Sequence, residues 1–593
     1  MKEVILKLIE KELKGKLKKE EIEKLIEIPP SDKMGDYSFP CFSLAKIEKK
    51  SPLLIAEELK EKIQLPIEIS NTDAKAGYLN FFVNKKMLAK KILEKIIKEN
   101  KNFGKTNIGK NKTIVIDMSS PNIAKPFGIG HLRSTIIGNS IANICMYNGF
   151  KVIKINYLGD WGTQFGKLIV GYKKFGNASQ LKKDPIKHLY EVYVKANKES
   201  QSQQAERDSL SLQMGTNKNN HNKLQSIKPI CSNKEDYEQE ARDWFKKLEN
   251  GDKEALKFWK TFKELSLKEF EKIYKLLNIQ FNVISGESFY NTKMENTIQE
   301  LKKKNLLIES QGAFVVDLEK YNLGYCLIQK TDGATLYATR DITAAIDRHN
   351  KFKFEKMIYE VGSEQKLHFN QVFKVLELMG YKWAENLIHV EHGLYLGEDN
   401  KKLATRKGKT IFMQDILDET IQLAKKELES RYKLSKKELE SRSLSIARAA
   451  IFYGDLKNYR ANDMVFDIEN FISFNGNTGP YLQYSYARAN SILKKVKKST
   501  AKYELFDLKE QEIKLIKKLN DFPETIFKAY EKLSPSEISN YSYELSQIFN
   551  EFYQECPVIG SIEQNFRLKL VEAFRDVMKN SLNLLGIDAI EEM

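Results

Sequence analysis

The stretch DMSSPNIAKPFGIGHLRST, from Asp117 to Thr135, decides the fold. It follows a β-branched strand pattern over Thr113–Met118 and passes through serine, proline and glycine into a helical pattern that Gly149 ends. A strand that turns through glycine into a helix can receive phosphate on backbone N–H groups at the helix start. The segment therefore predicts a phosphate-binding turn that carries Lys125 and His131.

The turn alone leaves a structural interpretation open. Strand–turn–helix units are common and a single Gly-x-Gly is a weak pattern. A lone histidine at a helix start is more often structural than catalytic. The longer string around this histidine is far more specific.

The run SSPN-x-AK-x(4)-GHLRST resembles the signature of class I arginyl-tRNA synthetases, with residues 128–131 at the family's "HIGH" tetrapeptide. The resemblance continues in the family's order across nearly the whole chain, in GDWGTQFG (159–166), DGATLYATRD (332–341), LATRKGKT (403–410) and NTGPYLQYSYAR (477–488). It implies an enzyme that activates L-arginine with ATP and transfers the arginyl group to the 3′-terminal adenosine of tRNA(Arg).

Composition allows this interpretation without requiring it. A chain of 593 residues exceeds what one hydrophobic core usually organises, so we expect three or more domains. The 97 Lys and Arg against 80 Asp and Glu give a net charge of +17, which suits a polyanionic partner. Many of these lysines alternate with glutamates in helical patterns, where they are typical of solvated faces.

Cysteine spacing and hydropathy bear on the compartment. The five cysteines are scattered and include no C-x-x-C pair, so they indicate no zinc site, no disulfide framework and a reducing compartment. No apolar run approaches the roughly 20 residues needed to span a bilayer. The N-terminus has no signal-peptide pattern. We expect a cytoplasmic protein with no membrane partner and no protein-bound metal.

The chain divides into three regions. Residues 1–110 mix helical periodicity with the strand-like YLNFFVN at Tyr78–Asn84. Residues 111–410 alternate strands and helices as a doubly wound, Rossmann-like parallel sheet requires, and residues 411–593 are almost entirely helical in pattern. The predicted fold is an α/β catalytic domain with an α+β N-terminal domain and an all-α C-terminal bundle, and the resemblance assigns anticodon binding to that bundle.

The periodicity also predicts individual elements. Four strands are expected in the sheet: Thr113–Met118, Lys151–Leu158, Lys356–Val361 and Leu387–His392. Helices are expected at Thr339–Asn350, Ile416–Leu428, Ser445–Tyr453 and Glu537–Tyr553. Residues 201–233 are rich in Gln, Asn and Ser, so we expect a disordered surface insertion there.

Tyr78 and Asn80 are the expected tRNA contacts. The resemblance implies that the first region meets the D-loop at the tRNA elbow. A tyrosine ring can stack on an unpaired base, and an amide can both donate to it and accept from it. In the alternative interpretation, Tyr78, Phe81 and Val83 only pack in a sheet.

Arginine activation has a carboxylate attack the α-phosphate of ATP, so cations and donors are needed around the phosphates. His131 and Lys125 can supply them, and Gly130 allows close backbone approach. Gly128 replaces the first histidine of the tetrapeptide, which leaves the division of labour open. The resemblance implies that Lys125 substitutes for a lysine missing from a later loop.

That later loop corresponds to "KMSKS" elsewhere in class I. Thr405 stands where the second lysine would be, while Arg406 and Lys407 keep positive charge beside it. The resemblance implies ATP binding by Gly128, Gly130, His131, Thr405 and Lys407. Catalysis would then rest on Lys125, His131, Arg406 and Lys407, with Mg²⁺ accompanying the ATP phosphates.

Arginine selection requires a group that matches a planar guanidinium. Tyr337 and Asp341 are four residues apart at a helix start, and a carboxylate there can pair with a guanidinium through two hydrogen bonds. On the residues alone, a helix-capping aspartate under a packed tyrosine is the favoured alternative. The match to the family's Tyr-x-x-x-Asp reverses that preference. The resemblance adds Asn122 and Gln365 at the substrate's main-chain groups and Asp117 at its charged end.

Two other functions remain open on the sequence. A noncatalytic tRNA-binding paralogue is favoured only by the loss at Gly128. A nucleotidylyltransferase could share the Gly-x-Gly-His turn, but the helical C-terminal region and the basic chain argue against it. The partners we expect are tRNA(Arg), L-arginine and ATP, bound by a monomer.

Overall fold

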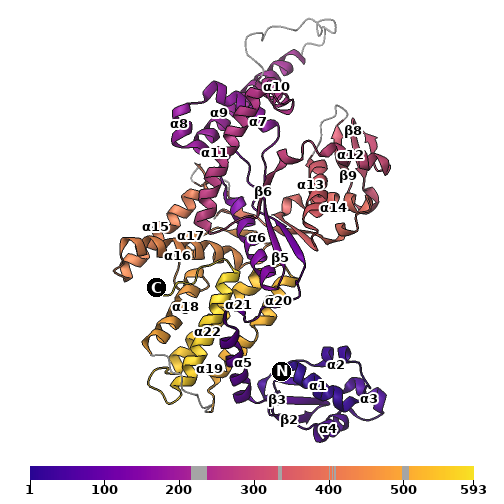
Figure 1. The fold of residues 1–593 in the computed structure, drawn as a ribbon, viewed down its shortest axis with the longest axis vertical. Coiled ribbons are helices and arrows are strands. Elements are labelled where there is room, and N and C mark those ends of the chain that lie inside the picture. Colours follow the sequence, from indigo (N-terminus) through magenta and orange to yellow (C-terminus); the bar gives the residue numbers. More distant parts are fainter. Residues whose placement is uncertain are drawn as a thin grey trace.

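The computed structural model describes residues 1–215, 237–330, 337–397, 399, 401, 403, 405–406, 409–496 and 507–593. Figure 1 shows an elongated molecule with the N-terminal domain at its lower end, a helical bundle beside it and a parallel sheet in the middle. Two further subdomains extend from the sheet, one at the upper end and one at the right.

The N-terminal domain is a small antiparallel sheet covered by helices. The strands run in the order β1 (Tyr37–Pro40), β3 (Tyr78–Val83), β2 (Ile69–Lys75). Their buried side chains pack with those of the helices into a core of their own. The helices are α1 (Lys2–Leu13), α2 (Lys19–Leu25), α3 (Phe42–Glu48) and α4 (Pro52–Lys62).

Helix α5 (Lys85–Glu99) joins this domain to the rest of the molecule. Asn84 caps its start by accepting a hydrogen bond from the N–H of Met87 at 3.1 Å. Its buried face, which includes Ile92 and Ile96, belongs to the main core and packs against the C-terminal bundle. Helix α5 therefore connects the N-terminal sheet to the C-terminal bundle (Figure 1).

The central sheet has five parallel strands in the order β11-β10-β4-β5-β6. Its strands are β4 (Thr113–Asp117), β5 (Lys151–Leu158), β6 (Val283–Gly286), β10 (Lys356–Gly362) and β11 (Leu387–His392). The four strands predicted from sequence are confirmed. The sequence did not predict β6, because four residues carry too little periodicity.

Different helices pack on the two faces of this sheet. Strand alternation sends Ile116, Ile358 and Val390 toward α6 (Ile129–Tyr147). The intervening residues, such as Val115, face α13 (Tyr337–Phe352) and α14 (Lys366–Leu378). Side chains at the carboxyl ends of the strands therefore divide into two groups, one on each face.

Two insertions interrupt the sheet. The first is helical and lies at the upper end of Figure 1, with α7 (Thr163–Phe175), α8 (Ala178–Lys183), α9 (Pro185–Gly215), α10 (Tyr237–Glu249) and α11 (Lys253–Leu277). The second contains α12 (Met294–Lys303) and an antiparallel sheet of β7 (Ile308–Ser310), β8 (Ala313–Asp317) and β9 (Tyr325–Lys330).

The prediction of a disordered insertion over 201–233 is wrong for its first part. Helix α9 continues through Gly215, because helical hydrogen bonding extends past the end of the apolar pattern. Composition alone could not locate that end, since Gln, Ser and Glu are all tolerated in helices. Residues 216–233 lie outside the described residues.

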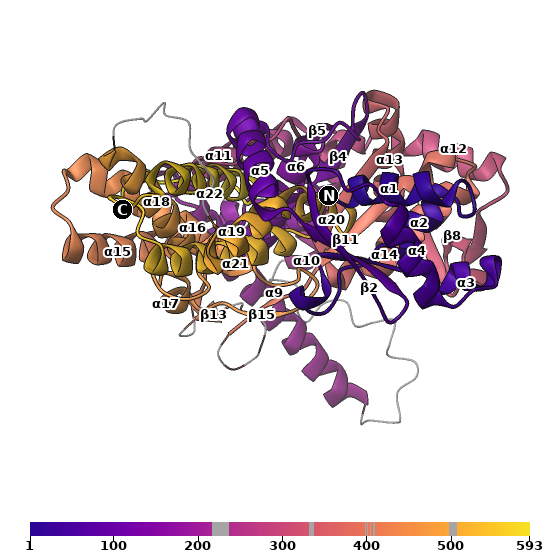
Figure 2. The same cartoon turned by 90° about the horizontal axis from the view of Figure 1, so that it is seen from below.

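The C-terminal region is helical, as predicted. Its helices are α15 (Met413–Arg431), α16 (Lys436–Leu456), α17 (Ile468–Phe471), α18 (Gly479–Lys495), α19 (Glu510–Asn520), α20 (Phe522–Glu531), α21 (Ser536–Glu555) and α22 (Gln564–Leu584). Short strands precede or interrupt them: β12 (Tyr395–Leu396), β13 (Thr405–Arg406), β14 (Lys409–Thr410) and β15 (Met464–Val465). Seen from below in Figure 2, the bundle lies on one side and α1–α4 on the other.

Two further features concern the sequence predictions. Among the described residues, no helix is both long and apolar enough to cross a membrane. The cysteines at 41, 145, 326 and 556 are buried free thiols. Cys231 lies outside the described residues.

Candidate active site at the carboxyl edge of the sheet

The loop between β4 and α6 has an unusual backbone. Ser119, Ser120 and Ala124 have φ of 79°, 46° and 59°, in the left-handed region that residues with a side chain rarely adopt. Such conformations each cost on the order of 1–3 kcal/mol and persist only where surrounding contacts enforce them. The strain lies within the motif that the sequence analysis singled out.

Helix α11 supplies several of those contacts. The hydroxyl of Ser266 accepts a hydrogen bond from the N–H of Ala124 at 2.8 Å. The hydroxyls of Tyr274 and Ser119 lie 2.7 Å apart, and Thr135 donates to Ser119 at 2.8 Å. The loop is thus held between α6 and a helix contributed by the first insertion.

His131 lies in the first turn of α6 and is half-buried. Its pKa is lowered to about 4, mainly by burial and in part by the nearby positive charges of Lys125 and His392. The imidazole is therefore neutral near pH 7. Its Nδ1 accepts a hydrogen bond from the N–H of Gly128 at 3.2 Å, so the proton is on Nε2. Nε2–H remains as a donor.

Crowding does not require glycine at position 128 or at position 130. Gly128 has φ −86° and ψ 166°, and a Cβ there would meet only His131 Nδ1, at 3.8 Å. A Cβ on Gly130 would meet nothing within 4 Å. Gly130 is exposed at the helix start, so a ligand can approach its backbone closely. A side chain could stand at position 128 without distorting the loop.

Lys125 is half-buried, and its Nζ lies 5.0 Å from the ring centroid of Tyr193 on α9. A lysine stem can swing its amino group by several ångströms about its side-chain bonds. The cation–π contact therefore holds Lys125 beside the loop without fixing it as strongly as an ion pair would.

The second phosphate-binding segment forms a short hairpin. Strands β13 and β14 pair Thr405 with Thr410 and Arg406 with Lys409. Lys407, which was predicted to bind ATP, lies outside the described residues. The hairpin places Thr405 and Arg406 next to each other along one strand.

On the other face of the sheet, α13 carries the residues predicted to bind arginine. The helix begins at Tyr337, two residues before the predicted start at Thr339, and Asp341 lies one turn further on. Tyr337 is exposed and Asp341 is half-buried. His368 of α14 places its Nε2 2.6 Å from Oδ2 of Asp341. The carboxylate is thereby oriented from a second helix.

Asp117 has a protein partner. It ends β4 almost fully buried, and Arg348 of α13 approaches its Oδ2 through Nη1 at 2.7 Å. Ser120 donates to its Oδ1 at 3.2 Å. Because Arg348 neutralises Asp117, the buried pair adds little net charge to this face. The carboxylate of Asp341, on the same face, is bonded to His368 instead of an arginine.

Asn122 and Gln365 lie in the segments that follow two neighbouring strands, β4 and β10. Asn122 sits in the strained loop and forms a bridge with Gly159 after β5. A Cβ on Gly159 would lie 2.0 Å from Oδ1 of Asn122, so a side chain there would displace the Asn122 amide. Gln365 is exposed where a 3-10 turn over Ser363–Gln365 leads into α14.

The sequence analysis missed a second carboxylate near Asp341. Glu287 follows β6 directly, and burial raises its pKa to about 7, with the charge of Asp341 adding to the rise. Its Oε1 lies 3.5 Å from Nη1 of Arg340, and its Oε2 accepts from the N–H of Trp161 at 3.2 Å. Only recognition of β6 could have pointed to Glu287. Trp161 is buried against Trp259 and Phe245, as a wall residue would be.

The two residues predicted to meet tRNA differ in exposure. Tyr78 is half-buried, and its ring packs edge-on against the exposed Phe42, with centroids 5.2 Å apart. Asn80 is 5% exposed, and its Oδ1 accepts a hydrogen bond from Ser38 at 2.5 Å. Tyr78 therefore presents part of its ring to solvent, while Asn80 presents very little.

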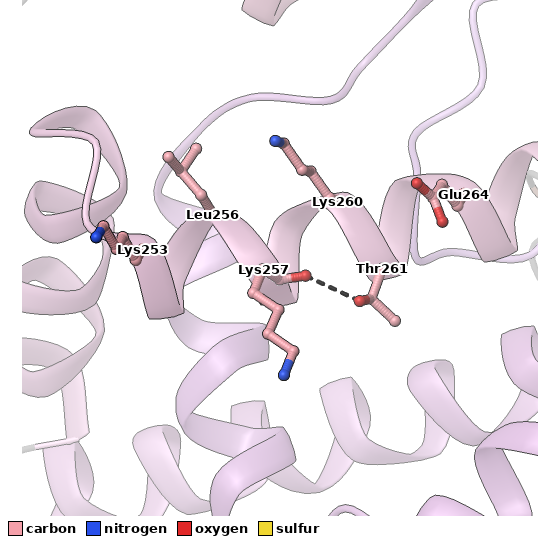
Figure 3. A pocket seen from close by; sticks show the side chains of 6 residues that line it. All are labelled: Lys253, Leu256, Lys257, Lys260, Thr261 and Glu264. Atoms are coloured by element: carbon pink, nitrogen blue, oxygen red, sulfur yellow. Dashed lines mark hydrogen bonds between the residues drawn. The ribbon is translucent and has the colours of Figure 1, made fainter.

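A shallow cleft of about 330 Å³ lies along the N-terminal half of α11 and contains none of these residues. Figure 3 shows that Lys257 and Lys260 point to opposite sides of the helix. Their amino groups do not converge on one point, so the cleft is no preformed phosphate site. The lining residues are Lys253, Leu256, Lys257, Lys260, Thr261 and Glu264.

Comparison with protein families gives three matches along the chain. Residues 3–83 match the arginyl tRNA synthetase N terminal domain, and residues 92–468 match the family described as tRNA synthetases class I (R), catalytic domain. Residues 482–593 match the DALR anticodon binding domain.

Individual proteins agree with these matches. The chain is 44% identical to an arginine–tRNA ligase of Clostridium perfringens, over 97% of each chain. It is also 44% identical to arginine–tRNA ligase 2 of Bacillus anthracis, over 98% of this chain and 97% of that one. Its fold resembles the Thermus thermophilus arginyl-tRNA synthetase, with a TM-score of 0.76 at 23% identity over 100% of both chains. The Plasmodium falciparum arginyl-tRNA synthetase gives 0.73 at 25% identity, over 96% of this chain and 94% of that one.

Proposed function

The chain belongs to the arginyl-tRNA synthetase family, and we propose that it joins L-arginine to the 3′-terminal adenosine of tRNA(Arg) through an arginyl-adenylate. One observation carries the assignment of residues. The loop with Lys125 and His131 and the helix with Tyr337 and Asp341 meet the same carboxyl edge of the parallel sheet, from its two faces. Ligands of open α/β sheets bind at that edge.

In the first step, an oxygen of the arginine carboxylate bonds to the α-phosphorus of ATP. The bond from that phosphorus to the bridging oxygen breaks, and pyrophosphate leaves with the electron pair. The neutral imidazole of His131 donates Nε2–H to the phosphate oxygens, and Lys125 supplies a positive charge. Gly130 offers a backbone N–H group, and Gly128, whose own N–H is bonded to His131, leaves room for the phosphates. Thr405, Arg406 and Lys407 add donors and positive charge.

Asp341 and Tyr337 select the guanidinium. A carboxylate with fixed orientation accepts two parallel N–H bonds from a guanidinium, which the single amino group of lysine cannot supply. Asn122 and Gln365 hold the substrate's main-chain groups. Asp117 holds Arg348 in place on this face of the sheet. Its carboxylate also contacts the charged end of the substrate.

In the second step, a hydroxyl of the terminal ribose attacks the arginyl carbonyl carbon and AMP leaves. The region 1–110 meets the tRNA elbow through Tyr78 and Asn80, the region 111–410 performs the chemistry, and the region 411–593 binds the anticodon. Oδ1 of Asn80 can contact a base only if its hydrogen bond from Ser38 breaks. Otherwise the amide nitrogen of Asn80 must donate to the base.

ATP enters as its magnesium complex, with the ion held by the phosphates, because Mg²⁺ retains water and binds phosphate readily. The enzyme acts as a monomer in the cytoplasm, where its three substrates meet. Sedimentation of the protein with and without tRNA checks the stoichiometry.

Charging of total tRNA with each amino acid in turn tests the function. The expected result is incorporation of arginine alone, together with arginine-dependent exchange of pyrophosphate into ATP when tRNA is present. Binding of tRNA without exchange would indicate the noncatalytic paralogue. Nucleotidyl transfer without any tRNA charging would indicate the nucleotidylyltransferase.

A further inference from the structure

Position 128 holds no imidazole, yet a second histidine lies beside the first turn of α6. His392 ends β11 and is 8% exposed. Its charge is one of the causes that lower the pKa of His131. No motif of the sequence pointed to His392.

A hydrogen bond clamps the two segments together. Nη1 of Arg133 donates to the carbonyl of Leu394 at 3.3 Å. Arg133 is two residues after His131, and Leu394 is two residues after His392. The guanidinium of Arg133 also lies 5.3 Å from the ring centroid of Tyr395. Arg133 is 1% exposed, so this contact is part of the core.

Strand alternation decides which way His392 faces. Val390 and His392 project from the same face of β11, and Val390 packs in the core that contains α6. His389 projects from the opposite face, where its ring stacks on Phe369 of α14. His392 is therefore on the face of His131, and His389 is on the face of Asp341.

Glu360 fixes the orientation of the imidazole. It lies on the same face of the adjacent strand β10, is 1% exposed, and contacts Nδ1 of His392 through Oε1 at 2.9 Å. With Nδ1 engaged, Nε2 is the atom that remains for another partner. Gly362 faces this end of the ring: a Cβ there would lie 3.7 Å from Nε2, at ordinary van der Waals distance, so the glycine adds no side chain beside Nε2.

We propose that His392 supplies the imidazole missing at Gly128, by contacting the triphosphate of ATP through Nε2 during arginine activation. The inference rests on the proposed function. No covalent bond to His392 forms or breaks. The ring donates Nδ1–H to Glu360 and Nε2–H to phosphate oxygens, so it carries both protons when ATP is bound, and it stabilises the charge that moves onto pyrophosphate. Glu360 acts as a positioning residue, because it holds Nδ1 and aims Nε2.

Two amide substitutions at His392 distinguish its contact with ATP from its hydrogen bond to Glu360. In His392→Asn, the amide nitrogen replaces Nδ1 and keeps the bond to Glu360, but nothing reaches the position of Nε2. In His392→Gln, the amide nitrogen replaces Nε2 and the bond at Nδ1 is lost. The measurement is arginine-dependent pyrophosphate exchange with tRNA, as kcat and the KM for ATP, on full-length protein that melts like wild type.

We expect His392→Asn to lower kcat for exchange by about 10²-fold and His392→Gln to lower it by less than about tenfold. Adding Gly128→His to His392→Asn should restore at least about tenfold, because a side chain fits at position 128. His389→Asn is the matched control and should stay within about threefold of wild type.

The outcomes are distinct. An Asn variant within about threefold of wild type, or a Gln variant impaired as much as Asn, would overturn the role of Nε2. Failure of Gly128→His to rescue would overturn the replacement of the missing imidazole. A wild-type protein without any arginine-dependent exchange would instead overturn the proposed function.

Discussion

Nε2 of His368 lies 2.6 Å from Oδ2 of Asp341, so the carboxylate proposed to select arginine has a partner before substrate arrives. Each carboxylate oxygen accepts two hydrogen bonds, so one lone pair of Oδ2 and both of Oδ1 remain for a guanidinium. The imidazole fixes the plane of the carboxylate, which reduces the ordering that binding must impose. His368 thus acts on arginine binding through Asp341.

Asp341→Ala should abolish arginine binding while ATP binding persists. Loss of the guanidinium's buried partner costs on the order of 2–5 kcal/mol, or roughly 30-fold to several thousandfold in affinity. The measurement is the KM for each substrate in pyrophosphate exchange. Asp347→Ala is the matched control, because Asp347 lies on the same helix but pairs with the partly exposed Lys293 at 2.6 Å. Wild-type kinetics in Asp341→Ala would remove Asp341 from the pocket.

Glu287 should make arginine binding depend on pH near neutrality. Its pKa of about 7, raised by burial, means that it gains its charge between about pH 6 and pH 8. The ionised form adds negative charge near Asp341, so arginine affinity should rise with pH over this range, by up to about tenfold. Glu287→Gln should flatten the dependence. An unchanged pH profile in the variant would contradict this role.

The same residue predicts a change in stability. Unfolded Glu287 releases its proton near 4.5, its usual value, whereas the folded protein holds it until about pH 7. Its contribution to the free energy of unfolding is therefore fully present below 4.5 and is lost as pH rises through 7. Glu287→Gln should melt higher than wild type at about pH 8, without arginine, and should lose that advantage toward pH 5.

The sequence predicts the regular parts of this molecule better than its site. β5 and β11 match their predicted ranges because strands of six and eight residues contain enough apolar and β-branched residues to be recognised. The pairing of Asp117 with Arg348 was not predictable, since the two residues are 231 positions apart and only the order of the sheet brings α13 beside β4. The left-handed backbone at Ser119 was also hidden, because serine does not signal it.

The site residues on short or irregular elements were missed for the same reason. Glu287 follows a four-residue strand, and His368 belongs to a helix with no recognised motif. Their importance comes from proximity to Asp341, which no local pattern encodes. Asp117 and Asn122, by contrast, could be named because the motif fixes their positions in the loop.

Deleting residues 1–83 should weaken tRNA charging more than it weakens binding of ATP or arginine. The cut spares α5 and its capping Asn84, and the buried face of α5 belongs to the main core. It breaks the half-buried ion pair of Asp36 with Lys517 at 3.0 Å. The loss of the elbow contact should lower kcat/KM for tRNA by roughly tenfold or more. Tyr78→Ala in the full chain should show part of that loss. Undiminished charging by the folded truncation would refute the assignment.

Lys125→Ala should reduce the rate of arginine activation by about 10²–10³, with little change in arginine affinity. The reason is that position 405 is threonine and position 128 is glycine, so few cations surround the departing pyrophosphate. In the absence of ligand, the amino group of Lys125 lies over the ring of Tyr193. This amino group must move away from the Tyr193 ring to reach the phosphates. The family resemblance implies that tRNA must bind before the site is complete.

Pyrophosphate exchange with and without tRNA, in wild type and in Lys125→Ala, tests both ideas together. The wild type should exchange only when tRNA is present, and the variant should be slow in either case. Tyr193→Leu separates the two effects, because it removes the cation–π contact but keeps Lys125, so exchange without tRNA should increase. A Lys125→Ala enzyme within a few-fold of wild type would show that this lysine takes no part in activation. Rapid exchange by the wild type without tRNA would show that the site is assembled beforehand.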